Sequence, residues 1–168
     1  MIDFDKDVKH FKRYQFDDPR SCYIGSGWLI NPELVSKLDE LITITGWNIK
    51  PHYSIGGGVV MDEKLENKRF CLDEHHLRNK GYCAVDFHFE IDAPPEEQLK
   101  VLYKMGFSGI GVFTNLAIAS YARDEFDLLP IAFHVDLRKI PTFWVCNERG
   151  KNRYMSIKSV LKEVQCYN

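Results

Sequence analysis

The chain has 168 residues, of which 45% are hydrophobic and 13% aromatic, enough to bury one substantial core. Its formal net charge of −2 gives no electrostatic reason to bind nucleic acid, and no apolar run reaches the length of a membrane span. We therefore expect a single domain over residues 1–168 without a nucleic-acid partner or membrane insertion, and leave its oligomeric state open. The charged N-terminus does not resemble a signal peptide, so we expect synthesis in the cytoplasm.

Five cysteines are scattered along the chain without a CxxC pair. They are Cys22, Cys71, Cys83, Cys146 and Cys166. Their odd number and wide spacing favour reduced, mostly buried thiols over a disulfide framework or a thiolate zinc ribbon.

The first clear helix signal is the pair Asn31-Pro32, an N-cap residue followed by proline at the first helical position. An apolar stripe at helical spacing extends this helix to about Ile42. The β-branched run ITITGW, residues 42–47, then predicts a strand. Three consecutive glycines, residues 56–58, predict a loop that continues to about Arg69.

Apolar and polar residues alternate from Tyr82 to Ile91, which predicts a strand with one face on the core. The core face of this strand would carry Cys83, Val85, Phe87, Phe89 and Ile91. The pair Pro94-Pro95 predicts the start of a second helix, which Gly106 ends.

Three short strands are expected next, at residues 109–113, 131–137 and 142–146. A last helix is expected within residues 155–165, because Ile157, Val160, Leu161 and Val164 recur at helical spacing. Helices and strands alternate without a regular βαβ rhythm. The sequence therefore predicts an α+β fold with a small, mostly antiparallel sheet and flanking helices.

Two of the expected strands carry residues suited to chemistry. In IAFHVDL, residues 131–137, the apolar side chains share one face, which places His134 and Asp136 together on the other. Asp86 and His88 lie in the same way on the strand at 82–91. If the two strands are close in one sheet, these imidazoles and carboxylates converge into a set that suits catalytic zinc.

A simpler interpretation stands beside this one. Polar residues alternating with apolar ones are typical of any strand that exposes one face to solvent, and spacing alone favours that interpretation.

Six segments occur in an order that distinguishes between these interpretations. They are ITITGWN at 42–48, SIGGG at 54–58, EHHL at 74–77, GYCAVDF at 81–87, GFSGIGVF at 106–113 and FHVDLRKIPTFW at 133–144. Together they resemble the phage and bacterial branch of the zinc D-Ala-D-Ala-type peptidases, peptidase family M15, over about residues 16–145. The resemblance implies a hedgehog or D-Ala-D-Ala peptidase-like fold. It also implies that the protein hydrolyses peptide bonds of bacterial peptidoglycan stem peptides by metal-activated water, as a carboxypeptidase or an endopeptidase.

The same resemblance implies the metal ligands. The family pattern SxHxxGxAxD matches His76 and Asp86, and its HVDxR element matches His134, so these three residues would hold Zn2+. A shift of one residue would replace His76 by His75, and His88 remains a further candidate for a ligand or for hydrogen bonding to one.

Catalytic roles follow by the same comparison. Asp136 is the nearest matching acid for the general base, or else it hydrogen-bonds a ligand imidazole; Asp127 is a more distant candidate. Asn48 occupies the place of the family's SGYR arginine and would contact the carbonyl oxygen of the substrate. His52 and Tyr53 would line the substrate groove.

Three departures from the family pattern favour an alternative. Asp86 follows His76 by ten residues, more than the pattern allows, and Glu74 stands where the family has serine. Asn48 supplies a hydrogen bond but not the charge of the family's arginine. The alternative is a non-catalytic structural or binding protein that keeps the peptidase fold. For the peptidase, the family's phage members imply action on the cell wall after lysis or holin release, or assembly into a virion. A phage component is one form that the alternative would take.

Overall fold

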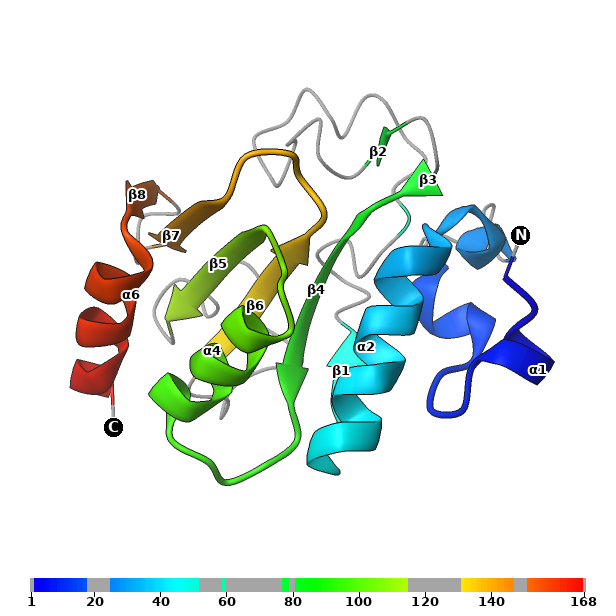
Figure 1. Cartoon of the computed structure of the whole chain (residues 1–168), viewed down its shortest axis with the longest axis horizontal. Helices are drawn as coiled ribbons and strands as arrows, with labels where there is room; N and C mark the ends of the chain where they lie inside the picture. Colours follow the sequence, from blue (N-terminus) through cyan, green and yellow to red (C-terminus); the bar gives the residue numbers. More distant parts are fainter. Residues whose placement is uncertain are drawn as a thin grey trace.

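The computed structural model of the chain describes residues 2–17, 25–51, 59, 77–78, 81–114, 131–146 and 151–167. Its main sheet has six strands in the order β1-β4-β6-β5-β7-β8 (Figure 1). The strands are β1 Ile49–Pro51, β4 Ala84–Phe89, β5 Gly109–Thr114, β6 Ile131–Asp136, β7 Thr142–Cys146 and β8 Asn152–Met155. All neighbours pair antiparallel except β5 and β7, which are parallel. Two short strands, β2 Leu77–Arg78 and β3 Gly81–Tyr82, form a separate hairpin.

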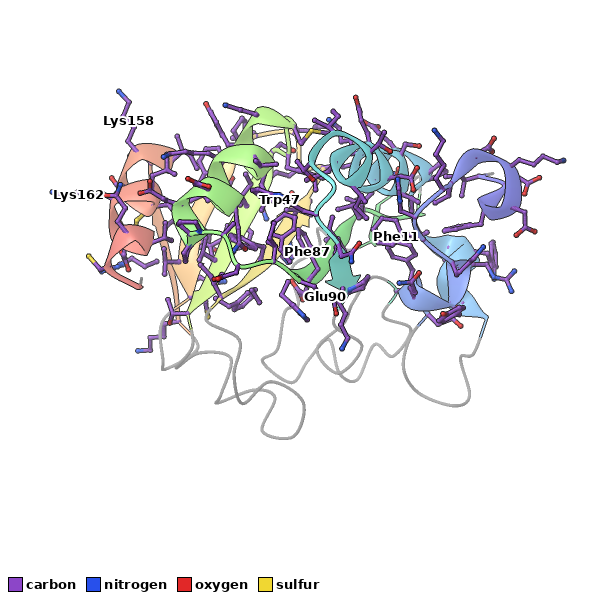
Figure 2. The ribbon with its side chains drawn as sticks, turned by 90° about the horizontal axis from the view of Figure 1, so that it is seen from below. Phe11, Trp47, Phe87, Glu90, Lys158 and Lys162 are labelled. Carbon is purple, nitrogen blue, oxygen red and sulfur yellow. The ribbon has the colours of Figure 1, made fainter. Side chains whose placement is uncertain are left out.

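The longer helices lie on one face of this sheet. The helices are α1 Phe4–Asp7, α2 Pro32–Thr45, α4 Pro95–Lys104 and α6 Ile157–Val164, with 3-10 turns at Arg13–Phe16, Ser26–Leu29 and Gln165–Tyr167. Figures 1 and 2 show α2 and α4 on the same side of the sheet. Helix α6 packs beside α4 and against β7. Within the described ranges, no helix combines the length and apolar character that a membrane span requires.

The core lies between these helices and the sheet. On β4, Phe87 and Phe89 stack edge to face at 5.2 Å, and both rings also contact Phe133 of β6. Leu38 of α2 and Leu99 of α4 are completely buried in the same cluster. The observed α+β architecture with a mostly antiparallel sheet confirms the expected fold class, because the alternating apolar residues of β4, β5, β6 and β7 face the apolar stripes of the helices.

Helix α2 extends farther than predicted. The expected strand at 42–47 is wrong, because this segment continues the helix to Thr45. Thr43 and Thr45 donate hydrogen bonds from their hydroxyls to the carbonyls of Asp39 and Leu41, four residues earlier. Gly46, at φ 70°, ends the helix by donating its N–H to the carbonyl of Ile42. The β propensity of these residues is therefore outweighed by the continuing helix and by the glycine cap that ends it.

Other boundaries agree with the sequence signals. The side chain of Asn31 accepts a hydrogen bond from the N–H of Glu33 at the start of α2. Pro95 begins α4, and Gly106 follows it at φ 74°. Lys37 of α2 donates to the carbonyl of Met105 at 3.0 Å and thereby ties the two helices together.

The C-terminal region contains one element that the sequence did not indicate. Strand β8 pairs antiparallel with β7 along an exposed edge, and its residues show no apolar alternation. The helix after it begins as expected, because Ser156 caps α6 by accepting from the N–H of Ser159 at 3.2 Å.

Candidate metal centre

A row of paired residues crosses five strands on the sheet face that points away from the helices. Asp86 of β4 is in register with His134 of β6, and His134 is in register with Gly111 of β5. Gly111 pairs in turn with Trp144 of β7, and Trp144 with Tyr154 of β8. Alternation along each strand therefore brings the polar residues of two expected strands into one place.

The polar residues that β4 and β6 place on this face are buried. Asp86 and Asp136 have 0% exposure, His134 has 2% and His88 has 4%. The interpretation as a solvated strand face is therefore wrong for β4 and β6. Buried charged groups are retained only with hydrogen-bonding or ionic partners, so the contacts of these four residues decide what they can do.

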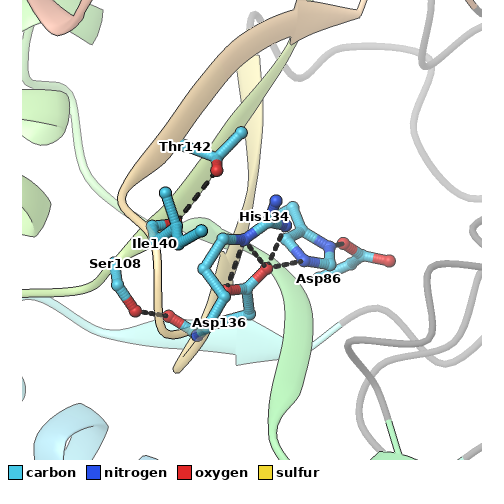
Figure 3. Close-up of polar contacts among 7 residues, drawn as sticks. Asp86, Ser108, His134, Asp136, Ile140 and Thr142 are labelled. Atoms are coloured by element: carbon cyan, nitrogen blue, oxygen red, sulfur yellow. Dashed lines mark hydrogen bonds and ion pairs between the residues drawn. The ribbon is translucent and has the colours of Figure 1, made fainter.

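His134 lies between two carboxylates (Figure 3). Its Nδ1 atom is 2.8 Å from Oδ1 of Asp86, and its Nε2 atom is 3.2 Å from Oδ2 of Asp136. One carboxylate comes from the neighbouring strand and the other from two residues farther along β6. Each ring nitrogen of His134 thus faces a carboxylate, one from β4 and the other from β6.

Asp136 is held in turn by Arg138. The backbone N–H of Arg138 donates to Oδ1 at 2.9 Å, and its Nε donates to Oδ1 at 2.8 Å and to Oδ2 at 2.9 Å. The Nη2 atom of Arg138 forms an ion pair with Oδ2. This side-on arrangement uses the guanidinium fork, which fits a carboxylate and fixes its plane.

The ionisation of the cluster follows from these contacts. Burial alone would lower the pKa of His134, but the charge of Asp86 and hydrogen bonds to both carboxylates outweigh it and raise this pKa to about 10. Burial alone would raise the pKa of Asp136, whereas hydrogen bonds from His134 and Arg138 hold it well below its usual range. Burial and the charge of Lys50 keep the pKa of His88 below its ordinary value. These contacts favour the imidazolium form of His134, which lies between two carboxylates.

One carboxylate oxygen of the cluster accepts no hydrogen bond from the described residues. The Oδ2 atom of Asp86 is buried and has no hydrogen-bond partner among the described residues. An unpartnered carboxylate oxygen in a buried site costs free energy unless a cation or a donor meets it.

Two glycines of β5 make room for this cluster. A Cβ atom on Gly109 would overlap the carboxylate of Asp136, and one on Gly111 would overlap the indole of Trp144. The space above Gly111 lets Trp144 approach His134, with ring centroids 5.2 Å apart. The indole also lies under the guanidinium of Arg138, 4.8 Å from its Cζ atom.

The chain matches no protein-family model, no curated protein and no solved structure. The resemblance to the zinc D-Ala-D-Ala-type peptidases therefore depends on the motifs of this chain alone.

Only some of the expected site residues come together in the structure. Asp86, His134 and Asp136 form the cluster, whereas His75, His76, Asp127, His52 and Tyr53 lie outside the described residues. Within the described ranges, no group of three or more His, Cys, Asp or Glu side chains is arranged to hold a metal.

Asn48 is separated from the cluster. It is exposed, and its carbonyl accepts a hydrogen bond from the N–H of Glu90 at 3.0 Å. Glu90 follows Asp86 by four residues, a separation of about 13 Å along an extended chain. The structure therefore does not bring Asn48 together with Asp86 and His134.

The donor atoms that are present fit zinc in part. Asp86 supplies a carboxylate and His134 an imidazole, which are the oxygen and nitrogen donors zinc accepts. The unpartnered Oδ2 of Asp86 is consistent with a cation at this point. A third protein ligand would have to come from a segment outside the described residues, where His76 lies.

The sequence interpretation gave no separate role to three residues that shape the cluster. Gly109 and Gly111 were expected only as parts of a strand, and Arg138 only as part of the segment 133–144. The signal for the glycines is their spacing, because both fall on the strand face that carries no core residue.

Proposed function

We propose that this protein is a zinc-dependent peptidase that hydrolyses peptide bonds in the stem peptides of bacterial peptidoglycan. The observation that carries the metal part is the buried pair of Asp86 and His134, with a carboxylate oxygen that has no partner among the described residues. The substrate class is supported by the ordered motifs that resemble the D-Ala-D-Ala-type peptidases.

In this proposal Asp86, His134 and His76 hold the metal. Zinc would supply a Lewis acid that polarises a carbonyl and makes water nucleophilic at neutral pH. Asp86 and His134 contribute donors from two hydrogen-bonded strands, so their separation is set by the sheet rather than by a loop. Trp144 packs against the ring of His134, a residue that is only 2% exposed.

The proposal is tested by assaying zinc content and hydrolysis of purified peptidoglycan together. We expect the wild-type protein to bind one zinc per chain and to release peptide fragments. Asp86→Asn keeps the shape of the side chain but removes the charge, and should abolish both. Asp92→Asn, the same change at an exposed position after β4, should alter neither. A wild-type protein that binds no zinc would contradict the proposal.

Two observations favour a second candidate, a non-catalytic structural or binding protein of the same fold. Both ring nitrogens of His134 already have carboxylate partners, so the buried cluster is nearly satisfied without a metal. Asn48 also lies apart from the cluster, which leaves the expected carbonyl contact unsupported. Zinc binding without any peptide release from peptidoglycan, or from synthetic stem peptides, would favour this candidate.

A further inference from the structure

The contacts of Asp136 distinguish between the two roles that an acid beside a ligand histidine can have. A general base needs an oxygen that can accept a proton from water. A positioning residue instead needs oxygens that are already committed to the group it holds.

Both oxygens of Asp136 are committed. Oδ1 accepts from the backbone N–H and Nε of Arg138, and Oδ2 accepts from His134 and from Nε and Nη2 of Arg138. The carboxylate is completely buried, so water does not compete for these positions. Its orientation is fixed from one side by the guanidinium fork.

Arg138 is itself fixed. Its guanidinium lies over the indole of Trp144, and only 8% of the residue is exposed. A flat, delocalised cation stacks on an aromatic face in a way that a lysine ammonium does not. The missing side chain at Gly109 leaves the volume that the Asp136 carboxylate occupies.

These contacts fix the orientation of the His134 ring. With Nε2 donating to Asp136, the ring is held so that Nδ1 points at Asp86. A metal ligand histidine works only when the nitrogen facing the metal carries the lone pair and the other nitrogen carries the proton.

We infer that Asp136 and Arg138 act as a positioning pair that holds His134 with its Nδ1 atom toward Asp86, the other proposed zinc ligand, and that Asp136 is not the general base. This inference rests on the proposed function, because it concerns the same zinc site. Arg138 acts on His134 indirectly, by holding Asp136 in place. The general base is then another residue.

The experiment compares Asp136→Asn and Arg138→Gln with the wild-type protein, using Arg153→Gln as the matched control. Arg153 also forms an ion pair with a carboxylate, that of Glu163, but its side chain is 61% exposed and its partner lies on α6 rather than in the cluster. Three quantities are measured: the Kd for zinc by competition with a chelator, the ring ¹⁵N signals of His134 by NMR, and kcat against pH at saturating zinc.

We expect both cluster variants to weaken zinc binding by about 10–100-fold. The Nε2 proton of His134 should exchange with water faster in both variants than in the wild type. At saturating zinc, the residual kcat of Asp136→Asn should keep the acid limb of its pH profile at the wild-type position. Arg153→Gln should match the wild type in all three measurements.

Two further variants keep the test valid if Asp136→Asn does not fold. Arg138→Lys retains the positive charge but loses the fork and the stacked plane, so zinc binding should fall even though the charge is conserved. Gly109→Ala pushes the Asp136 carboxylate out of place without changing any charge, and should weaken zinc binding in the same direction.

The results distinguish a failure of this inference from a failure of the proposed function. An Asp136→Asn protein with unchanged zinc affinity and unchanged His134 signals, but no turnover at saturating zinc, would identify Asp136 as the general base and overturn this inference alone. A wild-type protein that binds no zinc would overturn the proposed function and this inference with it.

Discussion

The Nδ1 atom of His134 lies 2.8 Å from Oδ1 of Asp86, although 48 residues separate the two in the chain. They face each other because β4 and β6 are neighbours in the sheet with these two residues in register. A buried imidazole and a buried carboxylate at this distance stabilise each other, and removal of His134 takes this partner away from the buried Asp86. Three measurable consequences follow from this pair and from the sheet that holds it, and a fourth concerns the N-terminal segment.

Zinc should stabilise the folded protein. At a free zinc concentration 100 times the Kd, the free energy of unfolding should rise by about 2.7 kcal/mol, because the unfolded chain does not preserve the site. The midpoint of thermal unfolding should therefore increase on zinc addition and return on chelation. Asp86→Asn should show no increase, while the exposed change Asp92→Asn should behave as the wild type.

The zinc-free protein should lose stability as the pH rises above neutral. The pKa of His134 is about 10 in the folded state against an ordinary value of 6.5, so the folded state binds the proton more tightly. The stabilisation is complete below pH 6.5 and is lost as the pH rises toward 10. Urea unfolding of chelated protein at pH 6 and pH 9 measures this difference. His134→Gln should be much less sensitive over the same interval, and equal slopes for the two proteins would contradict the assignment.

Gly111→Ala should destabilise the protein by about 1–3 kcal/mol, because the added methyl group would overlap the indole of Trp144 in a packed sheet. Urea unfolding measures the loss, and tryptophan fluorescence reports the displaced ring. The double variant Gly111→Ala with Trp144→Leu should lose less than the sum of the single variants, because the smaller side chain removes the overlap. Strict additivity would show that the two positions do not interact.

Asp39→Ala should loosen the N-terminal segment. The carboxylate of Asp39 in α2 accepts hydrogen bonds from the backbone N–H groups of Lys9 at 3.0 Å and His10 at 2.7 Å. Loss of these acceptors should cost about 1–3 kcal/mol. Limited proteolysis should then cut near Lys9 sooner than in the wild type. Glu40→Ala, an exposed neighbour on the same helix, is the control and should leave the rate unchanged.

Much of the secondary structure follows from local signals. The helix starts at Pro32 and Pro95 and the strand at 142–146 agree with the sequence, because proline, cap residues and alternation act over a few residues. The segment 42–47 does not agree. Its β-branched residues continue a helix whose apolar stripe includes the buried Ile42, so burial outweighs local propensity.

Local sequence patterns also could not predict that the polar residues of β4 and β6 are buried. Alternation in β4 and β6 correctly separates Asp86 and His134 from the apolar side chains, but it is the same for an exposed face and for a covered one. The arrangement of Arg138 could not be read from the sequence either. Its contact with Asp136, two residues earlier, depends on Gly109 and Trp144 from other strands.

The sequence by itself determined the mostly antiparallel α+β composition, most element boundaries and the strand faces on which Asp86, His134 and Asp136 lie. These properties depend on neighbours within one or two turns or pleats. Only the tertiary structure decided that β4 and β6 are adjacent in this register, that His134 lies between two carboxylates, and that Asn48 lies apart from them. Strand order and register come from packing between residues far apart in the chain, which no local pattern encodes.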